Sequence, residues 1–328
     1  MKNRLKKAVS ILLCGTLAFS ALSGCGQKAE DEVIIYSNAD DEAIEAIKKT
    51  LDENGYEGKY IIQTFGTSEL GGKLLAEGTN IEADMVTMSS FYLESSQEEN
   101  NMYVDLSFDT GALEEYPSYY TPITSQEGAI IVNTEEMKNN NLPMPTSLKD
   151  LANPEYEGFL SVTDIAGSST AWLMIQALVS EYGEDGAKEV LSGIYKNAGA
   201  HLEDSGSGPI KKVRAGEVAI GFGLRHQAVA DKAEGLPIDF VDPSEGNFSL
   251  TESVAIIDKG KDTNPLAMEM AECIIKKGRS EIIKYYPNPI YEGESADQEN
   301  QSAYPKKFDQ PLTVDLLEEH KKLSEECK

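Results

Sequence analysis

Three short segments combine glycine with hydroxyl residues in a way that suits the binding of an anion. The first two follow predicted strands and open predicted helices, where free backbone N–H groups and the helix dipole attract an oxyanion. Each segment also has a structural interpretation, because Ser and Thr cap helices and Gly-Ser runs form plain loops. The residue types leave both interpretations open. The segments are Gly66-Thr67-Ser68, Gly167-Ser168-Ser169-Thr170 and Ser205-Gly206-Ser207-Gly208.

Arg225-His226 is a second kind of candidate, placed shortly after the predicted strand 218–222. A guanidinium and an imidazole suit phosphate or phosphonate, because charge-assisted hydrogen bonds to such oxygens are strong. The alternative is that Arg225 pairs with a carboxylate of this acidic chain. Small polar side chains near the ends of other predicted strands complete this group of candidate ligand-binding residues. They are Ser37, Asn38 and Ser89.

Four acids near predicted strand or loop ends could hold the ammonium group of a zwitterionic ligand. They are Asp40, Asp41, Glu245 and Glu252. Asp40 and Asp41 also complement the dipole of the helix that they open. Most acids of the chain should simply be solvated, so the sequence does not separate a binding acid from a surface acid.

Residues for enzymatic catalysis are sparse. The chain has three histidines, His201, His226 and His320. It contains neither a Gly-x-Ser-x-Gly elbow nor a His-Glu-x-x-His motif, and its cysteines show no metal-binding spacing. We therefore expect a binding protein and not an enzyme, with no cofactor and no metal. Cys273 suits a buried thiol, and a disulfide between Cys273 and Cys327 remains an open alternative.

The elements that position these residues alternate along the chain. Apolar runs at 33–36, 59–63 and 83–86 alternate with helical patterns, and a second alternating block runs from about 134 to 245. Such alternation predicts α/β architecture, with sheets covered by helices. Ligands of open α/β sheets bind beyond the carboxyl ends of the strands. Several of the candidate residues fall there.

The N-terminus predicts export and lipidation. A head with Lys2, Arg4, Lys6 and Lys7 precedes an apolar run from Ala8 to Ala21, which is too short for a membrane span of roughly 20 residues and is typical of a secretory signal. The following Leu-Ser-Gly-Cys resembles the bacterial lipobox, which implies that residues 1–24 are removed and that Cys25 carries lipid. We therefore expect anchoring to the extracytoplasmic face of the cell membrane, through a tether over 25–32.

The net charge excludes one class of partner. At pH 7 the chain carries a formal charge of −27, and removal of the basic leader makes it more negative. A surface this acidic disfavours binding to nucleic acid and adhesion to anionic lipid. The lipid anchor would then be the sole membrane contact. A small anion is still permitted, because its binding depends on local groups.

Eight segments in a fixed order resemble the bacterial solute-binding proteins of ABC importers, in the group that includes ferric-iron, phosphonate and sugar-phosphate binders. The likeness covers roughly residues 33–290, and its most specific part is P-x-S-L-K-D-L-x-x-P-x-Y-x-G. The segments are VIIYSNAD, FGTSELGGKLLAEGTNIEADMV, GAIIVNTEEM, PTSLKDLANPEYEGFLSVTD, GSSTAW, KKVRAGEVAIGFG, GLPIDFVDPSEGNF and SVAIIDKG.

This resemblance implies a two-lobed periplasmic-binding-protein fold, each lobe a mixed sheet flanked by helices, with two hinge strands between them. The first lobe would comprise 33–125 and 255–328, and the second 126–254. A monomer would capture a small anionic solute, such as 2-aminoethylphosphonate or an organic phosphate, and deliver it to an ABC permease with its ATPase subunits.

The expected binding residues are Ser37, Asn38, Thr67, Ser68, Ser89, Ser168, Ser169, Thr170, Arg225, His226 and Glu245. The alternative solutes are ferric iron, a polyamine or thiamine. Ferric binders of this group carry adjacent tyrosines near the position of Arg225, and this chain has none there. That departure favours the oxyanion.

Overall fold

The computed structural model describes residues 32–328. The expected signal segment, the lipobox and Cys25 fall outside the described residues, so lipidation stays a prediction. In the described part of the chain, no helix is both long and apolar enough to span a membrane.

One half of the sheet, which we call the first lobe, contains three short parallel strands in the order β2-β1-β3. All five residues of β1 are buried, as its apolar sequence predicts. The first helix packs the face that carries Ala43, Ile47 and Leu51 into the core, because these residues recur at helical spacing. The elements are β1 (Val33–Ser37), α1 (Asp41–Leu51), β2 (Tyr60–Thr64), α2 (Thr67–Glu77), β3 (Met85–Ser89) and α3 (Ser90–Asn100).

The other half, which we call the second lobe, contains four further strands and is covered by the longest helix of the described chain. Here β5 lies between β6 and β7 and is parallel to both, while β7 and β8 pair antiparallel with β4. The elements are α4 (Thr134–Asn139), β5 (Leu160–Thr163), α5 (Thr170–Ala198), β6 (Leu202–Glu203), α6 (Gly208–Ala215), β7 (Ile220–Leu224), α7 (Arg225–Ala233) and β8 (Ile238–Val241).

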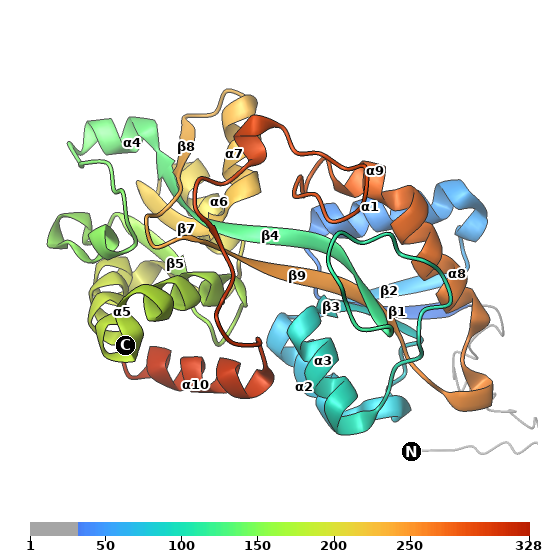
Figure 1. The fold of residues 1–328 in the computed structure, drawn as a ribbon. Helices are drawn as coiled ribbons and strands as arrows, with labels where there is room; N and C mark the ends of the chain where they lie inside the picture. Colours follow the sequence, from blue (N-terminus) through green and yellow to red (C-terminus); the bar gives the residue numbers. More distant parts are fainter. Residues whose placement is uncertain (1–31) are drawn as a thin grey trace, which may run out of the picture. The chain divides into compact units, whose positions relative to one another are not determined.

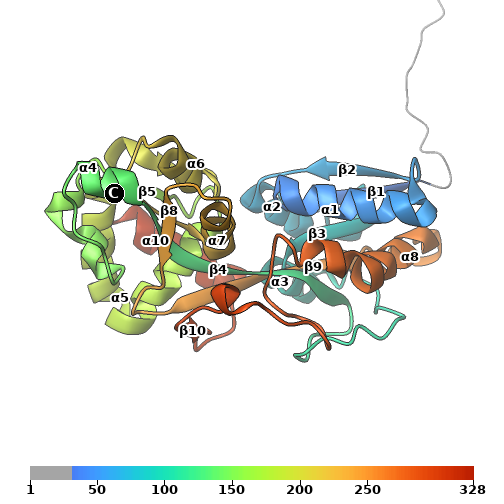
Figure 2. The same ribbon diagram turned by 90° about the horizontal axis from the view of Figure 1, so that it is seen from above.

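Two long antiparallel strands, β4 (Tyr120–Asn133) and β9 (Asn247–Ile256), run from one lobe to the other (Figure 1). The first part of β4 pairs with β9, and residues 128–132 pair with β7. On its other side β9 pairs with β3. The strand order is therefore β2-β1-β3-β9-β4-β7-β5-β6. This confirms the expected α/β fold of two lobes with mixed sheets and two shared strands; Figure 2 shows both strands from above.

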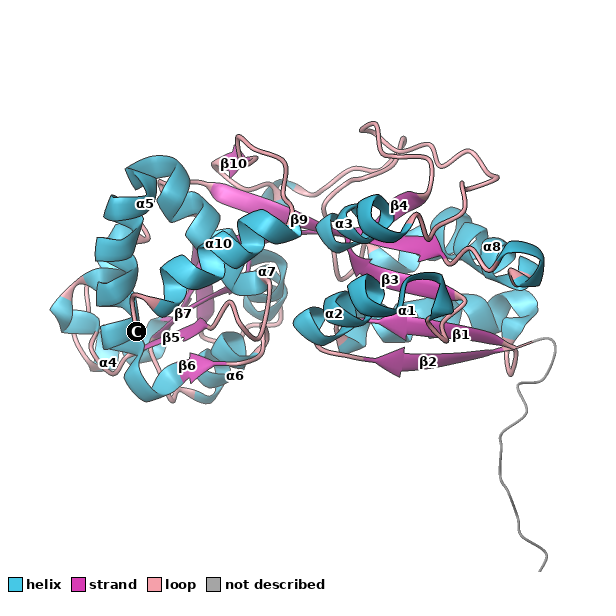
Figure 3. Ribbon diagram, turned by 90° about the horizontal axis from the view of Figure 1, so that it is seen from below, coloured by secondary structure: helices cyan, strands magenta, loops and turns pink. Residues whose placement is uncertain are grey.

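The C-terminal segment returns across both lobes. After α8 (Pro265–Cys273) and α9 (Arg279–Ile282), a short strand β10 (Pro305–Lys306) pairs with β9, and α10 (Val314–Glu325) ends the chain. The N–H of Val314 bonds Ser95 on α3, whereas the remainder of α10 packs on α5 (Figure 3). Helix α10 thus contacts both lobes, although 255–328 was expected in the first lobe.

Two buried hydrogen bonds attach α10 to α5. The indole of Trp172 donates to His320 at 2.7 Å, and Tyr195 bonds Ser324 at 2.6 Å. Burial lowers the pKa of His320 to about 4, so the imidazole is neutral and can accept. Trp172 therefore belongs to the core. Cys273 and Cys327 are both buried and free, so the alternative of a disulfide is not realised.

Candidate functional site

A cavity of about 400 Å³ lies between the two lobes, a size that suits a small ligand. The first lobe contributes the ends of β1 and β2 and the starts of α1 and α2. Glu252 of β9 pairs with Ser89 of β3 and so lies on the side of the first lobe, although the expected second lobe of 126–254 included it. The second lobe contributes the loops before α5 and α6. The lining residues that matter most below are Asn38, Asp40, Thr67, Ser168, Ser169, Thr170, Gly206, Ser207, Lys211, Arg214, Gln227 and Glu252.

Four helices begin at this cavity. Asp40, Gly66, Ser169 and Ser207 are the residues immediately before α1, α2, α5 and α6, and all four line the cavity. At none of these four starts does the preceding residue cap the helix with its side chain, which also holds for α3, α7 and α9 elsewhere, and at α5 Ser168 accepts a hydrogen bond from the N–H of Thr170 at 3.3 Å. Four positive dipole ends therefore face one space, which favours a negative charge there. The first N–H groups of α5 are already hydrogen-bonded to Ser168 and Ser169, and α6 has Pro209, which lacks an N–H, in its first turn.

The two loops of the second lobe touch each other closely enough to require glycine. A Cβ on Gly206 would lie 2.3 Å from the hydroxyl oxygen of Thr170 and 2.9 Å from that of Ser168. A Cβ on Gly167 would lie 2.3 Å from the carbonyl oxygen of Asp204. Glycine at these positions lets both loops, with their hydroxyls and amides, face the same point.

Two basic residues of α6 add positive charge beside these loops. Lys211 and Arg214 both line the cavity. Arg214 donates to Asp231 at 2.6 Å. Lys211 forms no salt bridge among the described residues, and its charge acts on Asp40, whose pKa it lowers against the effect of burial, so the ammonium group faces the cavity between the lobes. The sequence analysis missed both residues, although their spacing of three places them on one face of the helix.

The first lobe presents two acids to the cavity. Burial raises the pKa of Glu252 to about 8, and the nearby charge of Asp40 adds to the rise. Burial likewise raises the pKa of Asp40 to about 6, helped by Glu42 and Asp41. Tyr286 hydrogen-bonds Asp40 from behind. The cavity is thus polarised, with donors mainly on the second lobe and carboxyl groups on the first.

The structure brings five of the expected binding residues to the cavity, namely Asn38, Thr67, Ser168, Ser169 and Thr170. Ser68 lies at the junction of the lobes instead, where its hydroxyl donates to the carbonyl of Ala166 at 3.1 Å. Ser37 and Ser89 are fully buried behind the cavity and do not line it. The Ser37 hydroxyl accepts from the N–H of Ala39 and from Thr87.

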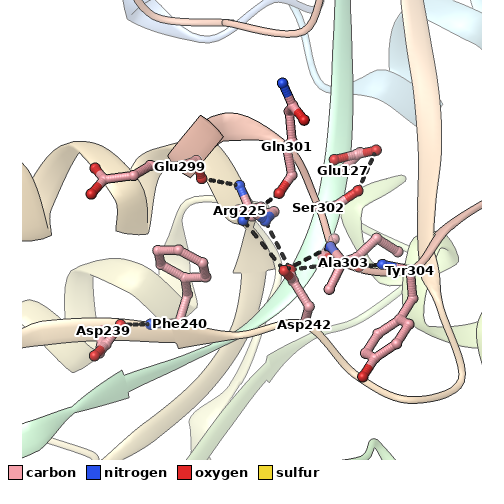
Figure 4. Close-up of polar contacts among 12 residues, drawn as sticks. Glu127, Arg225, Asp239, Phe240, Asp242, Glu299, Gln301, Ser302, Ala303 and Tyr304 are labelled. Atoms are coloured by element: carbon pink, nitrogen blue, oxygen red, sulfur yellow. Dashed lines mark hydrogen bonds and ion pairs between the residues drawn. The ribbon is translucent and has the colours of Figure 1, made fainter. Parts of the chain in front are cut away.

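Arg225 lies outside the cavity, in a buried cluster with the C-terminal segment (Figure 4). Its guanidinium forms two hydrogen bonds with Asp242, at 2.8 and 3.3 Å. It also donates to the carbonyls of Glu299 and Gln301, and it stacks over Phe240 with 4.5 Å between the guanidinium carbon and the ring centroid. The guanidinium of Arg225 is therefore occupied by contacts within the protein. The structure shows the alternative of a carboxylate partner, and not a ligand contact.

His226 and Glu245 also lie outside the cavity lining. The ring of His226 packs on Tyr286 with 4.7 Å between centroids, and burial lowers its pKa to about 3, so that it is neutral. Glu245 accepts from the N–H groups of Leu148 and Lys149 and from the hydroxyl of Tyr182, all at 2.9 Å. It supports the short helix at 149–152, within the segment that carries the strongest family resemblance.

Residues 84–311 match the family model described as bacterial extracellular solute-binding protein. The match spans more than half of the chain, so the chain belongs to this family. An uncharacterized protein of Haemophilus influenzae is 23% identical over 289 residues, which are 84% of this chain and 82% of that protein. Members of the family are binding proteins that deliver small solutes to ABC permeases outside the cytoplasm, and are not enzymes.

Solved structures show the same fold. The periplasmic binding protein P5PA has a TM-score of 0.74 at 19% identity, covering 90% of this chain and 97% of that one. AfuA from Actinobacillus pleuropneumoniae with bound fructose-6-phosphate has a TM-score of 0.72 at 20% identity, covering 90% and 96%. Iron-bound HitA from Pseudomonas aeruginosa has a TM-score of 0.71 at 19% identity, covering 90% and 99%. AfuA holds fructose-6-phosphate and HitA holds iron, and because all three are at most 20% identical to this chain, the likeness shows the fold alone.

Proposed function

We propose that this protein captures a small anionic solute, a phosphonate or an organic phosphate, in the cavity between its lobes. The observation that carries the proposal is the convergence of the N-terminal ends of four helices on one cavity. Backbone N–H groups, the hydroxyls of Ser168, Ser169 and Thr170 and the unpaired Lys211 supply donors and positive charge. Tetrahedral oxyanions take several such donors at once.

Binding between the lobes would stabilise a closed state. The hydrogen bond from Ser68 to Ala166 already joins the two sides, and a ligand that contacts both would add to it. Because β4 and β9 link the lobes, closure amounts to a hinge movement about these strands. An ABC permease would then recognise the closed form, with the protein held at the membrane through lipid on Cys25.

A thermal-shift screen followed by calorimetry tests the proposal. Alkylphosphonates and phosphate esters should raise the melting temperature, with a stabilisation of about 2.7 kcal/mol at 100 times the dissociation constant. Lys211→Ala should weaken their binding about tenfold or more, since it removes a charged hydrogen-bond donor. Lys276→Ala is the control, because this exposed lysine lies outside the cavity. If ferric salts alone shift the melting temperature, the oxyanion is the wrong ligand.

A further inference from the structure

A second cavity, of about 540 Å³, lies against the two strands that join the lobes. Ser125 of β4 and Thr251 of β9 are paired and line it, whereas the next residues, Gln126 and Glu252, line the cavity between the lobes. Successive side chains of a strand point to opposite faces of a sheet, so β4 and β9 separate the two cavities. We call the second one the rear cavity. Figure 2 shows β10 on one side of these strands and α2 and α6 on the other.

Aromatic and aliphatic side chains make up most of the lining of the rear cavity. Several of them are only partly buried, and Leu113 is 56% exposed. Covering such surface with an apolar molecule is favourable, because it removes the surface from water. A cavity of this volume takes a molecule of drug-like size. The side chains concerned are Phe91, Leu113, Tyr116, Ile290, Phe308 and Leu312.

The charged side chains of this lining already have partners. Glu94 accepts a hydrogen bond from the hydroxyl of Tyr120, and Glu114 forms an ion pair with Lys307. The hydroxyl of Ser249, in contrast, has no hydrogen bond with another described residue and is available to a ligand. A neutral molecule with one polar group suits this combination, whereas an ion would compete with the pairs that are already formed.

The walls of the rear cavity belong to different lobes. Helix α3, which directly follows β3, and the loop over 113–116 form the wall of the first lobe. The opposite wall follows the second lobe, because β10 pairs with the start of β9 and Lys306 donates to the carbonyl of Glu245 at 2.7 Å. The ion pair between Glu114 and Lys307 joins the two walls. The width of the rear cavity therefore depends on the angle between the lobes.

We propose that the rear cavity is a second binding site, for a neutral aromatic molecule, and that its occupation tightens the binding of the solute between the lobes. The second site goes beyond the proposed function and does not depend on it, whereas the coupling rests on a solute bound between the lobes. Both cavities flank the same two strands, so a hinge movement that narrows one widens the other.

The direction of the coupling follows from the contacts between the lobes. The hydroxyl of Ser68 reaches the carbonyl of Ala166 across the cavity between the lobes while the rear cavity is open. Opening of the lobes would separate these two residues and bring the walls of the rear cavity together. A molecule that fills the rear cavity therefore stabilises the closed arrangement, to which the solute also binds. By linkage, each ligand then raises the affinity of the other.

The first experiment titrates the full chain with N-phenyl-1-naphthylamine, a neutral aromatic dye whose fluorescence rises in apolar surroundings. We expect saturable binding of one dye molecule per chain. Leu113→Ala should weaken this binding about fivefold, because it removes apolar contact area. Ser249→Trp should abolish it, because the indole would occupy the cavity. Leu236→Ala is the matched control, since Leu236 is also an exposed leucine but lies outside the lining.

The second experiment measures the coupling by calorimetry with propylphosphonate, which probes the cavity between the lobes. A saturating concentration of the dye should raise the affinity for propylphosphonate about fivefold. Ser249→Trp should raise it similarly without dye, and added dye should then have no further effect. Ser280→Trp is the control, because Ser280 is an exposed residue of α9 outside both cavities.

Melting curves establish that each variant is folded, and Leu113→Ala tests the site even if Ser249→Trp does not fold. If the dye does not bind, or if Leu113→Ala binds it as tightly as Leu236→Ala does, the rear site is wrong. If the dye binds but leaves the affinity for propylphosphonate unchanged or lowers it, the coupling is wrong. If propylphosphonate and other phosphonates do not bind at all, the proposed function fails, while the dye titration still decides the rear site.

Discussion

At the residue scale, the arrangement separates groups that face a ligand from groups that resemble them in the sequence. Ser168 and Thr170 line the cavity, whereas Ser37 and Ser89 are buried behind it. All four are small hydroxyl residues near strand ends, so residue type could not separate them. Whether such a hydroxyl lines the cavity or is buried depends on the direction in which its side chain points. That direction is fixed by the pairing of the strands, which the local sequence does not show.

The correction at Arg225 has the same physical origin. Its partners Asp242, Glu299 and Gln301 are separated from it by between 17 and 76 positions, so no local pattern reveals them. Lys211 and Arg214 were missed for the opposite reason. On sequence alone they resemble solvated charges on a helix, and only the packing of the two lobes places them in the lining of the cavity.

Arg225→Ala should destabilise the protein without removing the binding site. The substitution leaves Asp242 buried and unpaired and releases two carbonyls of the C-terminal segment, so a loss of about 3–5 kcal/mol is expected. Denaturant unfolding measures this loss, and Lys284→Ala, an exposed lysine, is the control. Calorimetry under folding conditions should find phosphonate affinity within about twofold of the original. A large loss of affinity with unchanged stability would place Arg225 in the site.

At the element scale, the N-terminal ends of four helices form much of the cavity lining. The sequence predicted α2, α5 and their Gly-Ser-Thr openings correctly, because an apolar run followed by small hydroxyl residues is a strong local signal. The apolar patterns over 170–182 and 185–196 predict two separate helices, and the structure confirms the break between them, because α5 is interrupted at Gly183 with a non-helical φ of 66°.

The first part of β4 and the short strands β6 and β10 were not predicted. Residues 120–127 contain Pro122 and several polar side chains, which obscure a strand pattern. Their pairing with β9 comes from contacts more than 100 positions apart. Such long-range pairing overrides local preference.

Gly206→Ala should weaken anion binding while the fold is kept. The new Cβ would meet the hydroxyl oxygen of Thr170 at 2.3 Å, well inside van der Waals contact, so either the loops before α5 and α6 move apart or the hydroxyls of Thr170 and Ser168 turn away. Groups that converge on one oxyanion lose their alignment, and affinity for propylphosphonate should fall about tenfold.

Gly72→Ala is the matched control for that substitution. Gly72 lies in α2 with nothing within 4 Å of its would-be Cβ, so alanine should leave affinity unchanged and raise stability slightly. If Gly206→Ala binds as tightly as Gly72→Ala does, the contact between the two loops is irrelevant to binding.

At the scale of the whole molecule, the two lobes contribute different chemical groups to the cavity between them. The second lobe supplies amides, hydroxyls and a lysine, and the first supplies the carboxyl pair together with the starts of α1 and α2. A ligand that satisfies both walls draws the lobes together about β4 and β9. The fold followed from the sequence, as did the cavity lined by Thr67 and Ser168, whereas the distribution of charge around this cavity required the packing of the two lobes.

The most direct test is a crystal structure of the protein grown with 2-aminoethylphosphonate. We expect phosphonate oxygens inside the cavity between the lobes, within hydrogen-bonding distance of Lys211 and of the hydroxyls of Ser169 and Thr170. A phosphonate group bound outside the cavity between the lobes, or a cavity that stays empty at a saturating concentration, would contradict it.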